Sequence, residues 1–251
     1  MQRMPFSPGN NLYGVTVFLR YTKPSTTMKT VFVILFVLIT RTACTPSTGP
    51  IIGIDISHHQ GSINWDQVST WDGHPIQFIY IKATEGATYQ DNQYASYFKE
   101  AKKRGFKVGS YHYFRTTSSV ADQFANFKKV AVKRKQGLIP MVDIEEKKHW
   151  NNKDFHQNLK KFLRLVEAHY GVKPMLYSVN SFYNHHLSRG YEDYPCMIGR
   201  YGPNEPNIRH NNPWTIWQFS ETGKVKGIEK KVDIDKLNPS FQMKDLLMAS
   251  K

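Results

Sequence analysis

Cysteine is scarce in this chain of 251 residues, which contains only Cys44 and Cys196. Because Cys44 precedes the expected domain, the pair excludes a disulfide framework of the kind that stabilises small secreted proteins. Cys196 begins the apolar run Cys196–Ile198, and a free cysteine in such a run behaves as a small buried hydrophobe. We therefore expect Cys196 to belong to the core and not to act as a nucleophile.

Acidic residues are also few, since 20 Asp and Glu stand against 34 Lys and Arg, a formal net charge of +14. Five of the basic residues and no acidic residue lie in positions 1–44, which leaves 29 basic and 20 acidic residues, or +9, for the rest. Such a charge favours a polyanionic partner, and nucleic acid and an anionic cell wall both qualify. The basic runs Lys102–Arg104 and Lys133–Lys135 do not distinguish the two, because their helical spacing indicates solvated helix faces.

The apolar run near the N-terminus, Val31–Ile39, is too short to cross a bilayer. Lys29 precedes the run and small residues follow it, which is the pattern of a signal peptide over residues 28–44. Met28 is then the expected physiological start. Residues 1–27 show no apolar periodicity, and we interpret them as an upstream mis-start or a disordered segment.

The end of this segment leaves two interpretations open. Thr42–Cys44 resembles the cleavage box of bacterial lipoproteins, in which the cysteine is lipidated and attaches the protein to a membrane. Arg41 departs from that box, where an aliphatic residue is usual, so ordinary cleavage and release is the alternative. Residues 45–50, rich in Pro, Ser, Thr and Gly, are expected to form a tether. Either way the protein is expected to be exported to the cell envelope or secreted, as a monomer.

Residues 51–251 are expected to form one domain without internal repeats. Short apolar runs alternate with longer amphipathic stretches, which predicts strands separated by helices. The predicted strands are Ile51–Ile56, Gln77–Ala83, Lys107–Phe114, Leu138–Ile144, Pro174–Val179, Cys196–Tyr201 and Thr215–Phe219. The predicted helices are Tyr94–Arg104, Ser118–Lys135 and Asp154–Tyr170. This alternation predicts an α/β fold, an irregular TIM-like (β/α) barrel whose helices thin out toward the C-terminus.

Two acids after one aliphatic strand are the first candidate catalytic residues. Asp143 and Glu145 lie two positions apart, so they share one face of a strand, roughly 6–7 Å apart at Cα. They end the strand, and barrel enzymes hold their catalytic groups at the carboxyl ends of strands. Two close carboxylates cannot both ionise cheaply, so one is expected to keep its proton near neutral pH. Glycosidic cleavage needs such a pair, and a solvated strand end is the alternative.

Two further acids repeat this situation. Asp55 closes the aliphatic segment Ile51–Ile54, and Asp233 lies in the segment Lys231–Asp235 near the C-terminus. A single acid at a strand end is often only a helix cap. A closed barrel would nevertheless bring several strand ends together. Asp55 and Asp233 are therefore added to Asp143 and Glu145 as candidate catalytic residues.

Histidines and aromatic residues are the other candidates. The adjacent pairs His58–His59 and His185–His186 lack the i, i+4 spacing of a zinc site, so no metal or other cofactor is expected and a deacetylase-like metal hydrolase is a distant alternative. His112 ends a strand and either binds substrate or is a structural histidine. Aromatic rings near strand ends suit sugar faces or fill cores. These rings are Tyr111, Tyr113, Tyr177, Tyr201 and Trp217.

Taken together, these motifs resemble the family 25 glycoside hydrolases, the Chalaropsis-type lysozymes. The matching strings occur in the family's order and cover nearly everything from Ile51 to about Asn238. They are Gly53–Ser57, Phe78–Gly86, Gly109–Phe114, Met141–Glu145, Leu176–Ser178, Trp217–Phe219 and Val232–Asp233. The resemblance implies an irregular β/α barrel that hydrolyses the β-1,4 bond between N-acetylmuramic acid and N-acetylglucosamine in peptidoglycan.

The resemblance also implies roles for individual residues. Glu145 matches the general acid, Asp143 its partner carboxylate, and Asp55 and Asp233 the further acids of the groove. Asp143 either attacks covalently or steadies an oxazolinium formed by the substrate's own N-acetyl group, and we favour the second route. The substrate-binding residues are expected among the same strings. They are Lys82, Glu85, Tyr111, His112, Tyr177, Tyr201, Trp217 and Gln218.

Two departures from the family pattern bear on the groove. Asp235 stands where the family often has Asn, which adds a negative charge beside Asp233. The segment Ile198–Tyr201 replaces a stretch that usually carries a tryptophan, and Arg200 is a candidate to reach into the groove. Neither change removes a proposed catalytic group.

Three functions follow from the sequence. An active muramidase acting on peptidoglycan glycan strands is the first, and a non-catalytic wall-binding module of the same fold is the second. The third, a nucleic-acid binder, is motivated by charge alone, lacks a recognition motif and conflicts with the export signal. We therefore expect no nucleic-acid partner.

Overall fold

The computed structural model describes residues 49–211 and 213–248. The predicted mis-start, signal peptide and Cys44 lipidation site, and the tether as far as residue 48, lie outside these ranges and stay predictions. Among the described residues, no helix is both long and apolar enough to cross a membrane.

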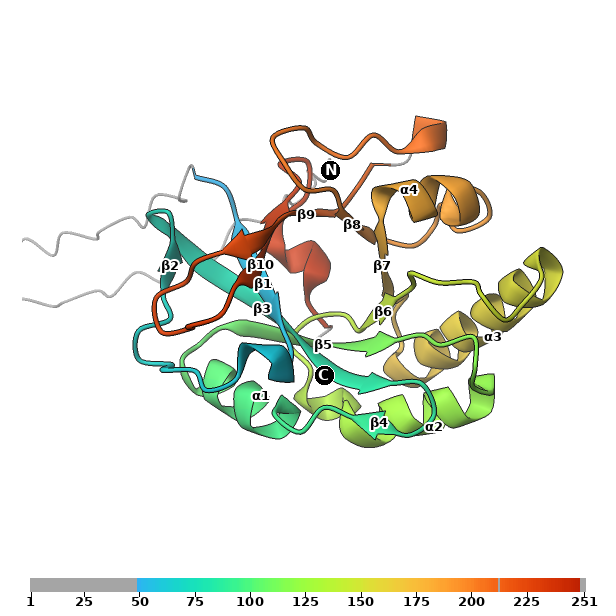
Figure 1. Cartoon of the computed structure of the whole chain (residues 1–251), viewed down its shortest axis with the longest axis horizontal. Helices are drawn as coiled ribbons and strands as arrows, with labels where there is room; N and C mark the ends of the chain where they lie inside the picture. The colour runs from blue at the N-terminus through green and yellow to red at the C-terminus, as the bar shows by residue number, and fades with distance from the viewer. Residues whose placement is uncertain (1–48, 212, 249–251) are drawn as a thin grey trace, which may run out of the picture. The chain divides into compact units, whose positions relative to one another are not determined.

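Eight strands form a closed barrel (Figure 1). Its order is β1-β10-β9-β8-β7-β6-β5-β3, and β1 pairs with β3 to close it. The strands are β1 (Ile52–Ile56), β3 (His74–Glu85), β5 (Lys107–Tyr113), β6 (Met141–Asp143), β7 (Met175–Val179), β8 (Cys196–Gly199), β9 (Ile216–Gly223) and β10 (Val232–Leu237). The short strands β2 (Thr70–Trp71) and β4 (Tyr89–Gln90) pair with β3 outside the ring.

Neighbouring barrel strands run parallel except at β10, which is antiparallel to both β9 and β1. The predicted α/β barrel is therefore confirmed, with one reversed strand that the sequence did not predict. The reversal matters for the site, because the start of β10 lies at the end of the barrel where the parallel strands finish.

The longer helices precede β8 in the chain. They are α1 (Tyr94–Lys103), α2 (Val120–Val130) and α3 (Asn152–Tyr170), and α4 (Asn180–Phe182) continues into a π-helical turn over Tyr183–Leu187. Figure 1 shows α1, α2 and α3 along the side of the barrel that contains β3, β5 and β6. Beyond β8, the helical elements of the described residues are only the 3-10 turns Arg209–Asn211 and Met243–Leu246. Helices therefore thin out toward the C-terminus, as predicted.

Helix α3 shows how the local sequence produces these elements. The Asn151 side chain accepts a hydrogen bond from the backbone N–H of Asp154 at 2.9 Å, which caps the first turn. One stripe of the helix is buried, comprising Phe155, Leu159, Phe162, Leu163, Val166 and Tyr170. Gly171 ends the helix at φ 77°, a left-handed conformation that glycine adopts without steric cost.

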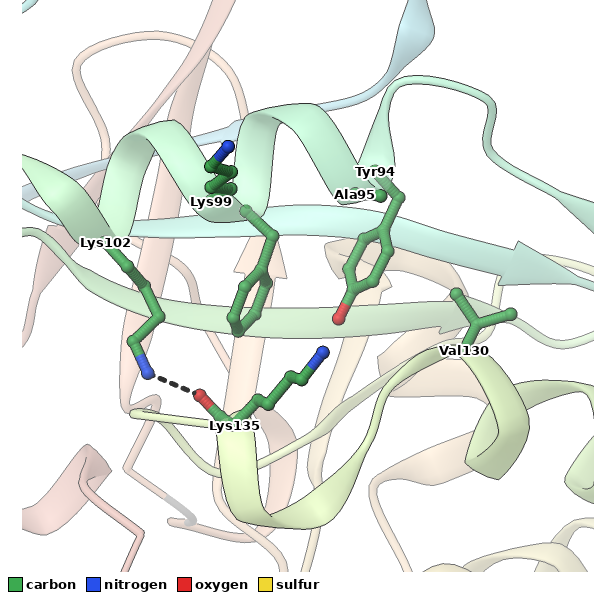
Figure 2. A pocket seen from close by; sticks show the side chains of 7 residues that line it. Tyr94, Ala95, Lys99, Lys102, Val130 and Lys135 are labelled. Carbon is green, nitrogen blue, oxygen red and sulfur yellow. Dashed lines mark hydrogen bonds between the residues drawn. The ribbon is translucent and has the colours of Figure 1, made fainter.

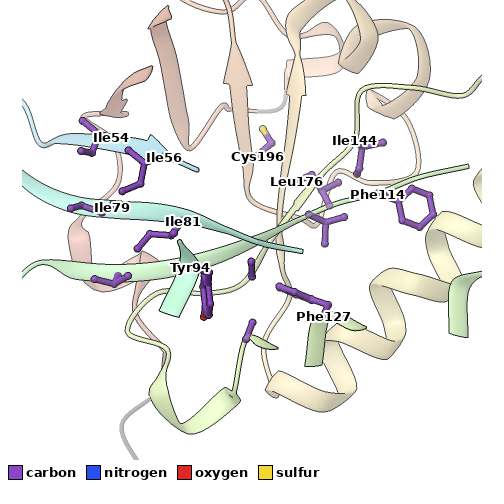
Figure 3. Packing of buried hydrophobic residues seen from close by; sticks show 14 of the residues in the cluster. Ile54, Ile56, Ile79, Ile81, Tyr94, Phe114, Phe127, Ile144, Leu176 and Cys196 are labelled. Carbon is purple, nitrogen blue, oxygen red and sulfur yellow. The ribbon is translucent and has the colours of Figure 1, made fainter. Parts of the chain in front are cut away.

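The core has two layers, because side chains alternate across each strand. The outer layer lies between the barrel and its helices, and Figure 3 shows part of it, with Ile54, Ile79 and Phe127 among the labelled side chains. The inner layer fills the barrel, and includes Phe78, Tyr80, Leu138, Met141, Met175, Met197, Ile216 and Leu237. Cys196 is fully buried in the outer layer, and burial raises the pKa of its thiol to about 11, as expected for a core residue.

Two glycines make room for the large rings of β3 inside the barrel. A Cβ on Gly53 would lie 2.2 Å from the Phe78 ring, and one on Gly109 would lie 2.5 Å from the Tyr80 ring. The strands on either side of β3 therefore have glycine where the Phe78 and Tyr80 rings fill the interior. Because side chains fill the barrel interior, a binding site can form only at an end of the barrel.

Candidate active site

The barrel interior becomes polar at the end where the parallel strands finish. Asp55 is opposite Asp233 in the β1–β10 pair, and Asp143 has Tyr113 and Tyr177 as its register neighbours on β5 and β7. Asp233 is the second residue of β10 and does not close a strand, which corrects the picture of three acids at strand ends. Because β10 is reversed, its beginning still meets the ends of the others.

Asp55 is held by a chain of hydrogen bonds. Its Oδ2 accepts from Gln218 Nε2 at 2.7 Å. Gln218 Oε1 in turn accepts from the hydroxyl of Tyr177 at 2.7 Å and from that of Tyr201 at 3.2 Å. Burial, followed by the charge of Asp233, raises the pKa of Asp55 well above 3.8, and the Gln218 hydrogen bond opposes this shift. The predicted residues Tyr177, Tyr201 and Gln218 thus form one network with an acid.

Asp143 and Glu145 face the same end of the barrel. Asp143 is 6% exposed, whereas Glu145 is only half-buried. Burial raises the pKa of Asp143 well above 3.8, and the charge of Glu145 and a hydrogen bond shared with it raise it further. Among the described residues, Oδ1 of Asp143 has no hydrogen-bond partner. The surroundings of Asp143 therefore disfavour its ionisation, and its Oδ1 is a buried acceptor.

Asp233 and Tyr111 complete the acidic cluster. Burial, then the charges of Glu221 and Glu145, raises the pKa of Asp233 to about 6. Burial and the charges of Asp55, Asp143 and Asp233, in that order, raise the pKa of Tyr111 well above its ordinary value. Each of the four predicted acids shifts the pKa of another of them or of Tyr111, which requires them to lie close together. The structure therefore brings the four acids together, as the sequence predicted.

Lys82 and Glu85 form an ion pair at the edge of this cluster. Lys82 Nζ lies 2.6 Å from Glu85 Oε2, and 5.2 Å from the centre of the Tyr113 ring. Glu85 Oε1 accepts from Arg115 at 2.8 Å through Nε and at 2.6 Å through Nη2. The guanidinium of Arg115 also lies 4.3 Å from the centre of the Tyr113 ring, so Tyr113 contacts two cations.

Two aromatic side chains border the cluster and reach solvent. Tyr201 is 47% exposed and Tyr89 is 40% exposed, and they are the exposed large apolar residues of the described ranges. The ammonium group of Lys82 lies 5.5 Å from the centre of the Tyr89 ring. The hydroxyl of Tyr89 lies 3.0 Å from Nδ1 of His58. Exposed rings next to buried acids are suited to contact sugar faces.

Beyond Glu145 lies a cavity of about 470 Å³. It is lined by Glu145, Glu146, Lys147, Lys148, Trp150 and Phe182. Because Glu145 lines it, the cavity continues the acidic site outward. A flexible polymer bound at the acids would have room here.

The comparisons with known proteins agree with this geometry. Residues 54–228 match the family model described as Glycosyl hydrolases family 25. The chain belongs to this family. Lysozyme M1 of Streptomyces globisporus is 30% identical over 219 residues, which cover 80% of this chain and 72% of that protein.

Other family 25 comparisons cover a similar range. The uncharacterized protein YegX of Escherichia coli (strain K12) is 33% identical over 200 residues, covering 78% of this chain and 73% of that protein. The crystal structure of the bacterial lysozyme from Streptomyces coelicolor matches with a TM-score of 0.69 at 28% identity, covering 79% of this chain and 96% of that one. Family membership makes the protein a glycoside hydrolase of the lysozyme type.

Within this family 25 domain, His112 is not at the groove. It is fully buried on the outer face of β5, where its ring lies 5.0 Å from that of Phe162. Its ring nitrogens lie 2.7 Å from Thr84 Oγ1 and 3.3 Å from Gln123 Oε1, and burial lowers its pKa to about 3. Of the two interpretations that the sequence left open, the structure supports the structural histidine and corrects the substrate-binding one.

Trp217 also faces away from the acids. Trp217 is 5% exposed within the outer core layer, and its Nε1 donates to the carbonyl of Arg200 at 2.7 Å. The guanidinium of Arg200 donates to the carbonyl of Glu205 at 2.9 Å. Trp217 is thus buried outside the groove, and the expectation that it contacts substrate is corrected.

A separate cavity of about 430 Å³ lies at α1 (Figure 2). It is lined by Tyr94, Ala95, Phe98, Lys99, Lys102, Val130 and Lys135, and Lys102 donates to the carbonyl of Lys135 at 2.8 Å. Its lining contains no acid, so it cannot supply the proton that glycosidic cleavage needs. Within the part of the chain that the structure describes, no group of three or more His, Cys, Asp or Glu residues could hold a metal ion.

Three residues around the site were not predicted from the sequence: Tyr89, Arg115 and Trp150. Trp150 could have been found, because it follows Glu145 within five positions on a loop rich in lysine. Arg115 comes two positions after Tyr113 beyond the end of β5, which is a weaker signal. Nothing in the sequence places Tyr89 beside Lys82.

Proposed function

We propose that this enzyme hydrolyses the β-1,4 bond between N-acetylmuramic acid and N-acetylglucosamine in peptidoglycan, with Glu145 as general acid and Asp143 as its partner. The supporting observation is the contrast within the pair: Asp143 is buried, whereas Glu145 is half-buried and lines the outer cavity. The names of the relatives, lysozymes from two Streptomyces species, support the substrate class.

Proton transfer follows from the environment of the two acids. The charge of Glu145 raises the pKa of Asp143, so ionisation of both acids at once is disfavoured. When a proton is on Glu145, the accessible acid can donate it to the glycosidic oxygen as the bond to the anomeric carbon breaks. Asp143 is then a carboxylate close to the positive charge that develops at that carbon, and it stabilises that charge.

The unpartnered Oδ1 of Asp143 supports a substrate-assisted route. A carboxylate oxygen without a protein partner can accept the N–H of the substrate's N-acetyl group and orient its carbonyl oxygen toward the anomeric carbon. That oxygen forms the new bond and gives an oxazolinium. Glu145, now a carboxylate, takes a proton from water as the water attacks the anomeric carbon, which opens the ring and restores the acid.

The remaining site residues hold and line the groove. The amide N–H of Gln218 donates a hydrogen bond to Asp55, and the Tyr177 hydroxyl donates one to Gln218. These hydrogen bonds hold the Asp55 carboxyl group in one position. Asp233 adds a second acid beside Asp55. Tyr89 and Tyr201 offer exposed rings on which sugar units can pack.

We also propose, from the sequence, that residues 28–44 direct export and that the mature domain, residues 51–251, acts as a monomer. Lysozymes act on cell walls, which agrees with export. Cys44 is proposed to be lipidated, and ordinary cleavage and release is the alternative.

Conversion of Glu145→Gln tests the acid assignment. Gln keeps the shape of the side chain but cannot donate a proton, so clearance of a peptidoglycan suspension should fall by a factor of about 100 to 10,000. Circular dichroism should match that of the unchanged protein. Retention of full activity by this variant would show that Glu145 is not the acid.

Product analysis tests the bond and the route. Mass spectrometry after digestion of defined peptidoglycan should find N-acetylmuramic acid at the new reducing ends. Glycan from which the N-acetyl groups have been removed should resist cleavage, because it cannot form the oxazolinium. Glycan that binds without any turnover would instead support the wall-binding module.

A further inference from the structure

The cavity beyond Glu145 combines two lysines with two aromatic rings. Lys147, Lys148 and Trp150 come from the loop between β6 and α3, and Phe182 comes from α4. We call this space of about 470 Å³ the lysine cavity. Uncharged sugar units can accept hydrogen bonds from ammonium groups but offer no negative charge to match them, so two lysines together need a separate explanation.

The positive charge of the lysine cavity is poorly compensated. Glu146 Oε1 lies 3.0 Å from Arg115 Nη1, whereas its Oε2 lies 3.8 Å from Lys148 Nζ. The Lys148 side chain is 77% exposed, and an ion pair this long and exposed contributes little. Lys147 Nζ donates to Asn152 Oδ1, a neutral amide that leaves its charge in place. Glu146 therefore pairs mainly with Arg115. Glu145 is the other acid in the lining, and within the described residues no ion pair joins it to Lys147 or Lys148, so both ammonium groups are open to a further anion.

The aromatic walls are anchored from behind. The Trp150 ring lies 5.8 Å from that of Phe114, and the Phe182 ring lies 6.2 Å from that of Phe155. Phe114 and Phe155 are fully buried, while Trp150 and Phe182 are half-buried. Each half-buried ring thus has a fixed position and can contact the apolar parts of a ligand at low entropic cost.

We propose that the lysine cavity binds a carboxylate of the peptide stem carried by the glycan strand that is cut at Glu145. This inference rests on the proposed function, and it names a further part of the same substrate. Peptide stems are attached to the muramic acid units and end in carboxylates, so a strand bound at Glu145 brings such an anion to the neighbouring cavity. Lys147 and Lys148 thereby favour stem-bearing strands over bare glycan.

A binding measurement without turnover tests the inference. The full chain carrying Glu145→Gln is titrated calorimetrically with two glycan oligomers of equal length, one with peptide stems and one whose lactyl carboxyl groups are capped as neutral methylamides instead. The ratio of the two dissociation constants measures the preference for stems. Adding Lys147→Ala and Lys148→Ala should reduce this preference by a factor of about 10, since two exposed charge pairs are lost.

The matched control removes the same charge elsewhere. Lys128→Ala with Lys129→Ala, on the exposed face of α2, should leave the preference unchanged. Raising the salt concentration should weaken the preference of the protein with Lys147 and Lys148 and have little effect on the double variant.

The outcomes separate this inference from the muramidase proposal. A preference that survives loss of both lysines would overturn the stem subsite, whatever the activity of the enzyme. Competition by poly(glycerol phosphate) at the lysine cavity without any effect of stems would overturn it in favour of a phosphodiester polymer. Absence of turnover by the unchanged enzyme would instead refute the muramidase, and the binding preference would still report on the lysines.

Discussion

Asp235 provides a direct test of the electrostatics inside the barrel. It is 0% exposed, and neither of its side-chain oxygens has a hydrogen-bond partner among the described residues. Its register neighbours are Gly53, which has no side chain, and Gln218, whose amide is engaged by Asp55 and two tyrosines. An ionised carboxylate there would lose its hydration and gain no partner. Burial, then the charges of Asp55 and Asp233, accordingly raises the pKa of Asp235 well above 3.8.

The raised pKa makes stability depend on pH in a defined direction. Below pH 3.8, Asp235 is protonated in both the folded and the unfolded chain. Above it, the unfolded chain releases this proton and the folded protein keeps it, so stability falls as pH rises toward the folded pKa. The slope for one proton is about 1.4 kcal/mol per pH unit. Asp235→Asn cannot ionise, so it should gain about 1.4 kcal/mol over the unchanged protein for each pH unit within that window.

Urea unfolding followed by tryptophan fluorescence at pH 4, 5, 6 and 7 measures this difference. Asp193→Asn is the control, because Asp193 has an 84% exposed side chain and its replacement should give a curve parallel to that of the unchanged protein. Activity should be retained by Asp235→Asn, since Asp235 is fully buried and the amide has nearly the same shape as the carboxyl group. A stability difference that does not change with pH would refute the reasoning, because Asp235 would then be ionised in the folded protein.

Two other substitutions give distinct results. Since the pKa of Asp233 is raised to about 6, its contribution to stability is present below pH 3.8 and lost as pH rises through about 6. In Asp233→Asn, the free energy of unfolding should no longer fall over this pH range. Carbon-13 NMR of the unchanged protein should show a carboxyl group that titrates near pH 6. His112→Leu leaves the hydroxyl of Thr84 without its partner and should lower the free energy of unfolding by about 1–3 kcal/mol. Its kcat/KM, measured well below the melting temperature, should change less than about twofold, and a large loss would return His112 to the site.

Much of the barrel was predictable because its strands and helices have strong periodic patterns. The apolar runs of β1, β3 and β5 and the buried stripe of α3 were found near their observed positions. The reversed direction of β10 was not predictable from Val232–Leu237, since the side-chain pattern of a strand is the same whether its neighbours are parallel or antiparallel. Only pairing with β1 and β9, both distant in sequence, decides it.

The candidate site was predictable in its acids and less so in its neighbours. Side chains alternate along a strand, so of Trp217 and Gln218 only one can face the interior, and the same holds for Tyr111 and His112. This alternation could have halved the set of substrate-binding residues. Which member faces inward depends on how each strand is turned in the barrel, and that orientation is set by contacts between strands.

The late position of β10 has a consequence for biosynthesis. A ribosome that has not yet delivered Val232–Leu237 has produced an open sheet with no Asp233 and with unsatisfied backbone edges on β1 and β9. Such an intermediate can neither cut a wall nor remain safely unpaired, because exposed edges recruit other chains. Premature stop codons upstream of this strand should therefore yield insoluble protein without activity. The molecule becomes an active hydrolase only after its final strand has been synthesised.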